Sequence, residues 1–127
     1  MNYIEIQNEV VKKYRIDLCA GDRCKDGDWT RTHAHIKQRR VCKWKQANSI
    51  QSTFTLFHEI GHIMTNKAGM RRAEEEYFAT VWAIDECNKY GLQVPQTIIN
   101  KYQWYIDMTA DRGKRRGGTG YGKLQLQ

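Results

Sequence analysis

The stretch from Ser52 to His62, STFTLFHEIGH, determines how the rest of this chain is interpreted. It ends in the pentad His-Glu-x-x-His, and the spacing of its apolar residues is helical. Residues four positions apart lie on one face of a helix, so His58 and His62 can bind a single Zn²⁺. The glutamate after the first histidine, Glu59, can take a proton from water at such a metal. The pentad therefore predicts a metal site suited to hydrolysis.

The pentad lies inside a predicted helix that runs from about Ile50 to Asn66. Either Ser49 or Ser52 can cap its start. Apolar or small residues recur at steps of four and three, which predicts a face turned to the core. The residues of this stripe are Ile50, Phe54, Phe57, Gly61 and Met64. Both histidines flank it, so the metal site is expected beside buried surface.

Catalytic zinc takes three protein ligands and keeps one position for water. A second helix is predicted from about Arg72 to Tyr90, and Glu76 shares one of its faces with small residues that can approach Gly61 closely. We therefore predict Glu76 as the third ligand, with Glu75 next. The alternative is that the glutamates are solvated first-turn residues, and we expect this for at least one of them. The candidates weighed were His33, His35, Glu74, Glu75, Glu76, Asp85 and Glu86.

The stretch from Ser52 to His62 resembles the active helix of the ImmA/IrrE-type zinc metallopeptidases, whose pattern is H-E-[LI]-[GA]-H. In that family an E-x-x-A-N-x-F-A helix follows, and EYFATVWA, from Glu76 to Ala83, is similar to it, with Thr for Asn and Trp for Phe. The resemblance covers about residues 30 to 90. It implies that zinc is bound by His58, His62 and Glu76, with Glu59 as the general base.

The chain also departs from that family. The Leu-Leu-Met-Pro that often follows in the family is Ile-Asp-Glu-Cys here, from Ile84 to Cys87, and no helix-turn-helix domain is recognisable. The basic C-terminal end lies outside the family pattern. The resemblance implies a small version of the kind expected in bacteria, phages and mobile elements.

The expected fold is α+β and zincin-like, with three to four helices and a small antiparallel sheet or hairpin beside the active helix. Residues 1–111 are predicted to form this single domain, and residues 112–127 a basic, Gly-rich mobile tail. The remaining predicted elements are a helix over Tyr3–Arg15, a loop over Cys19–Trp29, a strand pair over Thr30–Lys45 and a helix over Pro95–Thr109.

The chain of 127 residues carries 21 Lys and Arg against 14 Asp and Glu, a net charge of +7. The excess collects over Lys37–Lys45 and Arg112–Arg116. A solvated face is the preferred interpretation of these clusters, and an acidic protein or nucleic acid partner is the alternative. The aromatic residues near basic ones are expected in the core rather than on a nucleic-acid surface. They are Trp29, Trp44, Trp104 and Tyr105.

We expect a cytoplasmic protein without membrane partners, in the host cytoplasm if it is phage-encoded, because no signal-peptide pattern or bilayer-length apolar run is present. The cysteines are then expected to be mostly reduced. Free or buried thiols are preferred over a second, structural zinc site. These residues are Cys19, Cys24, Cys42 and Cys87.

His33 and His35 lie two apart in the strand-like segment, so their side chains point to the same side. We favour two exposed histidines. The alternative is that they line the cleft and stabilise an oxyanion.

The function predicted from the sequence is a zinc-dependent metallopeptidase that hydrolyses a peptide bond in an intracellular protein substrate. One alternative is a zincin-fold binding or inhibitory protein that engages an acidic protein or nucleic acid with little or no proteolysis. A further alternative is that zinc serves structure only.

Overall fold

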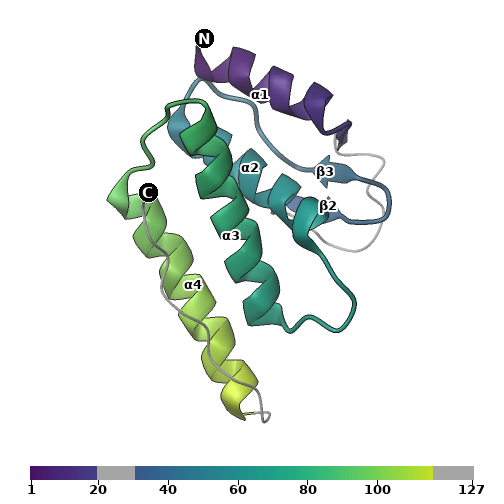
Figure 1. Cartoon of the computed structure of the whole chain (residues 1–127), viewed down its shortest axis with the longest axis vertical. Coiled ribbons are helices and arrows are strands. Elements are labelled where there is room, and N and C mark those ends of the chain that lie inside the picture. The colour runs from purple at the N-terminus through teal and green to yellow at the C-terminus, as the bar shows by residue number, and fades with distance from the viewer. Residues whose placement is uncertain (20–30, 116–127) are drawn as a thin grey trace.

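Four helices and a small three-stranded sheet form the part of the chain that the computed structural model describes, residues 1–19 and 31–115, with side chains to Ala110 (Figure 1). The fold is therefore α+β, as predicted. In chain order the elements are α1 (Tyr3–Lys13), β1 (Asp17–Cys19), β2 (His33–His35), β3 (Arg40–Cys42), α2 (Ile50–Thr65), α3 (Arg72–Lys89) and α4 (Gln96–Arg115).

The sheet has the strand order β1-β3-β2. β2 pairs antiparallel with β3, as the predicted hairpin requires, but β1 pairs parallel with β3. The sheet is therefore mixed, which corrects the expectation of an antiparallel one. Arg15 has a φ of 54° just after α1 and turns the chain into β1. A strand of three residues is too short to show an alternating pattern.

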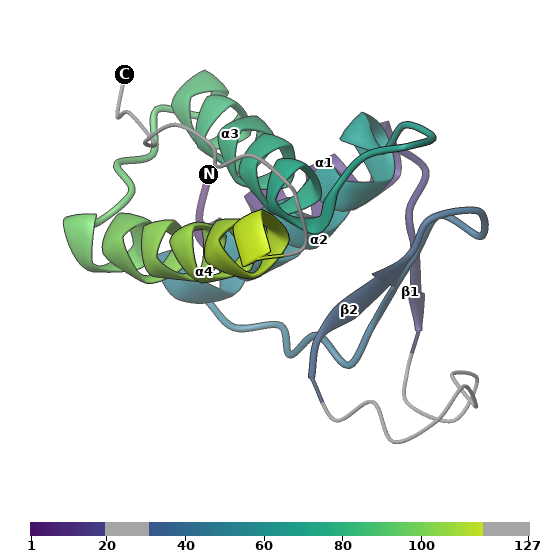
Figure 2. The same ribbon diagram turned by 90° about the horizontal axis from the view of Figure 1, so that it is seen from below.

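The helix that carries the pentad lies between the sheet and the other long helices (Figure 2). Its predicted start is confirmed, and Ser49 rather than Ser52 caps it, because the Ser49 side chain accepts a hydrogen bond from the Ser52 backbone N–H at 3.1 Å. Phe54 and Phe57 have no exposed surface. Met64, also predicted in the core stripe, is 39% exposed, and Ile63 is buried in its place.

The predicted bounds of the next helix are confirmed to within one residue, since α3 spans Arg72–Lys89. The last helix is longer than expected. α4 spans Gln96–Arg115 and crosses the predicted boundary between residues 111 and 112. The rest of the predicted tail, from residue 116 onward, lies outside the described residues.

Within the described ranges, no helix combines the length and apolar character needed to cross a bilayer.

The expectation of reduced cysteines is wrong for Cys42, which is disulfide-bonded. Cys87 is a buried thiol of α3. Because Cys42 is not a thiolate, the alternative of a four-cysteine zinc site does not form in this structure.

Candidate metal centre

The close approach of α2 and α3 brings the pentad beside Glu76. Gly61 is buried at the crossing, and a Cβ atom built on it would lie 2.5 Å from the backbone oxygen of Ala79. Only a glycine leaves room for this backbone contact. The small face predicted for α3 therefore does approach α2 at Gly61, and Glu76 lies one turn before Ala79 on that face.

Three side chains converge at this crossing. His58 Nε2 lies 3.2 Å from Glu76 Oε2, and His62 Nε2 lies 3.4 Å from Glu76 Oε1. One nitrogen of each histidine and one carboxylate oxygen all lie within 4.8 Å of one another. The group is largely shielded from solvent, with 7%, 14% and 3% of the respective side chains exposed. The sequence had proposed these three residues as metal ligands, and the structure places them together.

The donor set can hold a single metal ion, because two imidazole nitrogens and a carboxylate are ligands that zinc accepts. The two histidine nitrogens approach different oxygens of Glu76, at 3.2 and 3.4 Å. His58 Nε2 is buried and makes no hydrogen bond within the described part of the chain, although the Glu76 carboxylate is close. An unsatisfied buried polar atom is costly, and a metal ion between these atoms would satisfy it.

The electrostatics of the group favour an anionic Glu76. Burial alone would raise the pKa of the Glu76 carboxyl group, but the contacts with His58 and His62 outweigh it and hold the pKa far below its usual value. For His62, burial lowers the pKa, and the hydrogen bond and charge of Glu76 raise it by more. Glu76 is therefore a carboxylate ready to bind a cation.

Glu59 lies next to the three converging side chains without joining them. Its Oε1 atom is 3.8 Å from His58 Nδ1, and 13% of its side chain is exposed. Burial raises the pKa of Glu59, against the opposing effects of the two pentad histidines. A buried carboxylate with a raised pKa is a stronger base than an exposed one, as a proton acceptor requires.

Side chains from outside the pentad support the group. Arg72, in the first turn of α3, donates to Glu76 Oε1 at 3.1 Å and to the Tyr105 hydroxyl at 3.4 Å. The ring of Tyr102 packs on the ring of His58, with 4.6 Å between their centroids. Sequence reasoning did not assign these residues to the site. The one signal was the expectation that Tyr105 lies in the core.

The three converging residues, His58, His62 and Glu76, are called the metal group below. A pocket of about 1280 Å³ opens over the metal group, with walls from β2, α2, α3 and α4. His33 and His35 both line it, and His33 is only 9% exposed. The preferred prediction of two exposed histidines is therefore wrong, because β2 packs beside α2. The His33 Nδ1 atom lies 2.8 Å from the backbone oxygen of Arg31, which fixes its ring.

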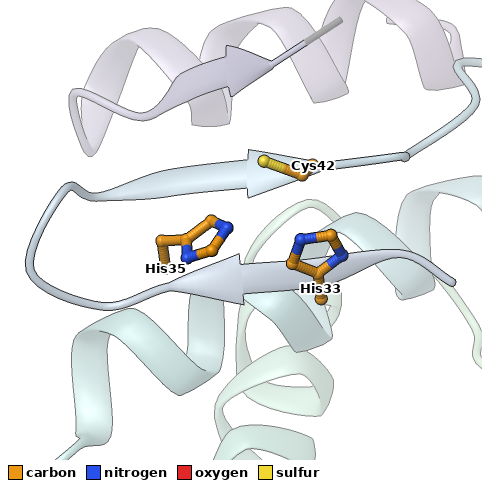
Figure 3. Close-up of side chains that lie close together, drawn as sticks. All are labelled: His33, His35 and Cys42. Carbon is orange, nitrogen blue, oxygen red and sulfur yellow. The ribbon is translucent and has the colours of Figure 1, made fainter. Parts of the chain in front are cut away.

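A second group of possible ligands lies on the sheet, where His33, His35 and Cys42 face one another across β2 and β3 (Figure 3). Their ligand atoms also lie within 4.8 Å of one another. However, the sulfur of Cys42 is part of a disulfide. It is not available as a thiolate, so this group does not form a three-ligand metal site in this structure.

The other acidic candidates are not part of the group that converges on His58 and His62. Glu75 lines the pocket, with Oε2 3.8 Å from Arg72 Nη1, and Glu74 is partly exposed. Asp85 is partly exposed. Glu86 is buried and accepts a hydrogen bond from the Tyr14 hydroxyl at 2.8 Å.

The aromatic and basic candidates differ in their surroundings. Trp44 packs against the core and donates to the Ser52 backbone oxygen at 2.9 Å, whereas Trp104 is 64% exposed and contradicts the core prediction. Trp29 lies outside the described residues, as do the side chains of Arg112–Arg116. In the other basic cluster the three lysines are exposed, as a solvated face requires. These are Lys37, Lys43 and Lys45.

Comparison with known proteins identifies no relative, since no protein family, curated protein or solved structure matches this chain.

Proposed function

We propose that this chain is a zinc-dependent metallopeptidase with a zincin-like active helix. His58, His62 and Glu76 hold Zn²⁺, and Glu59 is the general base. The observation that carries the proposal is the convergence of two histidines and a buried carboxylate at 3.2 and 3.4 Å, with a further carboxylate beside them and a pocket above. Three ligands of this kind leave one coordination position for water.

When bound, zinc would lower the pKa of a water molecule and polarise the carbonyl group of the substrate. Glu59 accepts a proton from the attacking water and then donates it to the leaving amine. Arg72 holds the carboxylate of Glu76 in place through the contact at 3.1 Å, and Tyr102 packs on His58 and restricts its ring. These contacts preorganise the site.

The substrate is an intracellular protein or a peptide in an extended conformation. β2 lies at the edge of the sheet order, and its residues line the pocket beside the pentad helix. An extended peptide can therefore add to the edge of β2 by backbone pairing. Such pairing would lay the scissile bond along α2, within reach of Glu59.

The alternative function is a zincin-fold binding or inhibitory protein that engages an acidic protein or nucleic acid. The exposed lysines of the segment over Lys37–Lys45 favour it, together with the net charge of +7. In that case Glu59 has no chemical task, although it is buried beside the metal group. A purely structural zinc site leaves the pocket of about 1280 Å³ without a role.

Metal analysis tests the site. Purified protein should contain about one zinc per chain, and Glu76→Gln should weaken zinc binding at least about tenfold, since it removes a charged ligand. Glu75→Gln is the matched control and should retain zinc, because Glu75 contacts neither pentad histidine in the structure. Equal zinc affinity in the two variants would contradict the ligand assignment.

Cleavage of a proteome-derived peptide library tests the reaction. Glu59→Gln should keep its zinc and lose cleavage by a factor of about 10² or more, because general-base catalysis contributes that much. If the wild-type protein, loaded with zinc, cleaves nothing in the library, the peptidase proposal is wrong. If the variant cleaves as fast as the wild type, the role of Glu59 is wrong.

A further inference from the structure

The charges around the pocket differ from those at its centre. At the centre, the formal charges of a bound Zn²⁺ would be balanced by Glu59 and Glu76. The remaining ionisable residues of known charge on the pocket wall are three cations, Arg31, Arg72 and Lys101, against the single anion Glu75. The rim of the pocket is therefore net positive, and it can attract a negatively charged part of a substrate.

Arg72 is the cation nearest to the metal group. Its Nη2 atom contacts Glu76 Oε1 at 3.1 Å and the Tyr105 hydroxyl at 3.4 Å, which holds the guanidinium group from one side. Its Nη1 atom approaches Glu75 only to 3.8 Å, beyond hydrogen-bond distance, and 61% of the side chain is exposed. A guanidinium group has five N–H donors, so Arg72 retains donors for a ligand in the pocket.

Lys101 is a second cation that lines the pocket, and it belongs to α4. Its side chain lies 6.0 Å from the centroid of the Tyr102 ring, and Tyr102 in turn packs on His58. No carboxylate pairs with Lys101 among the residues that the structure describes. Arg72 and Lys101 thus line one pocket from two helices. The contacts with Glu76 and Tyr105 position the Arg72 guanidinium group, and some of its N–H donors remain available to a ligand.

We propose that the pocket selects substrates with a carboxylate group close to the scissile bond, bound by Arg72 and assisted by Lys101. This inference rests on the proposed peptidase function. Arg72 contacts a zinc ligand directly, and an extended peptide advances about 3.3 Å per residue. A carboxylate on Arg72 therefore belongs to a residue within about two positions of the bond that is cut. An acidic side chain and the C-terminal carboxylate of a peptide share this chemistry.

Binding to the zinc-loaded Glu59→Gln protein tests the preference without turnover. The probes are fluorescein-labelled amidated hexapeptides of alanine and phenylalanine, with one glutamate moved through every position, and matched glutamine peptides. At one position glutamate should bind about tenfold more tightly than glutamine, because a hydrogen bond between two charged groups is stronger than one to a neutral amide. Free-acid peptides without glutamate show whether the C-terminal carboxylate is the preferred source.

Variants on the pocket wall assign the preference to residues. Lys101→Glu should lower the glutamate-to-glutamine ratio, because it replaces the assisting cation with an anion, and Lys101 contacts none of the proposed metal ligands. Arg72→Gln should reduce the glutamate-to-glutamine ratio to near one, with zinc content measured because Arg72 contacts Glu76. Arg71→Gln is the matched control, since Arg71 is exposed and does not line the pocket, and it should keep the full ratio.

The inference is overturned if neither the glutamate peptides nor the free-acid peptides bind more than about twofold more tightly than their uncharged counterparts. It is also overturned if Lys101→Glu and Arg72→Gln both leave the ratio unchanged, or if no probe binds the zinc-loaded protein. Failure of the proposed function has a different signature, namely loss of zinc binding or of library cleavage. A protein that cleaves the library without acidic preference would refute the inference and leave the peptidase function intact.

Discussion

Gly61 controls the distance between α2 and α3 and thereby the geometry of the metal group. A Cβ atom at this position would meet the oxygen of Ala79 at 2.5 Å and its Cα atom at 3.0 Å. Both are backbone atoms, so no side-chain rotation relieves the contact. The helices would have to separate, and Glu76 would move away from the histidines on α2.

Gly61→Ala should therefore weaken zinc binding as well as stability. Overpacking lowers the free energy of unfolding by about 1–3 kcal/mol, and the better helix propensity of alanine raises it by about 1 kcal/mol. We expect a net loss in urea unfolding and a lower zinc affinity in a competition titration. Adding Ala79→Gly should not rescue either property, because the clash involves the backbone. Wild-type zinc affinity in Gly61→Ala would show that the helix separation is not limiting.

The residues of the metal group were accessible from the sequence because each carries a local signal. The two histidines are four apart on one predicted helix, and Glu76 follows from the small-residue face of the next. Arg72 carries no such signal. Its role depends on contact with Tyr105, which is 33 residues away on another helix. Only the crossing of α4 over α3 shows this contact.

At the scale of elements, a partly buried polar contact joins the residue that follows α1 to α3. The Tyr14 hydroxyl donates to Glu86 Oε1 at 2.8 Å, and Lys89 lies 3.1 Å from the same oxygen. Glu86 is 1% exposed. Burial together with the hydrogen bond and charge of Glu86 raises the pKa of Tyr14 well above its ordinary value. The contact thus keeps a buried carboxylate satisfied.

Tyr14→Phe should destabilise the fold by about 1.5–3 kcal/mol, because it removes a hydrogen bond to a charged group and leaves that group less satisfied. Urea unfolding measures the loss. Tyr3→Phe is the matched control within α1, since the Tyr3 hydroxyl makes no hydrogen bond in the described structure, and it should change stability by less than about 0.5 kcal/mol. Zinc content should stay unchanged in both variants. An equal loss in both would mean that the Tyr14–Glu86 contact contributes nothing specific.

At the scale of the whole molecule, the long helices were predictable and the sheet was predictable only in part. α2 and α3 have 16 and 18 residues, long enough for the helical period to repeat several times. Each strand has three residues. Such strands depend on their partners, so the parallel pairing of β1 with β3 had no sequence signal. The burial of His33 follows from the same packing of β2 on α2.

The fold as a whole should lose stability at alkaline pH. Burial, followed by the charge of Glu86, raises the pKa of Cys87 from 9.0 to about 12. Burial and a hydrogen bond with Glu9 raise the pKa of Tyr90 from 10.0 to about 12. The native state therefore binds more protons than the unfolded state between about pH 9 and 12, and stability falls as the pH rises through this window. Below about pH 8 these groups make their full contribution to the free energy of unfolding.

Thermal unfolding followed by circular dichroism should give a midpoint that decreases steadily from pH 8.5 to 11. The decrease between pH 8.5 and 10 should be smaller in Cys87→Ala, because the thiol ionises first in the unfolded chain. A midpoint that is constant over this range would contradict the raised pKa values of both groups.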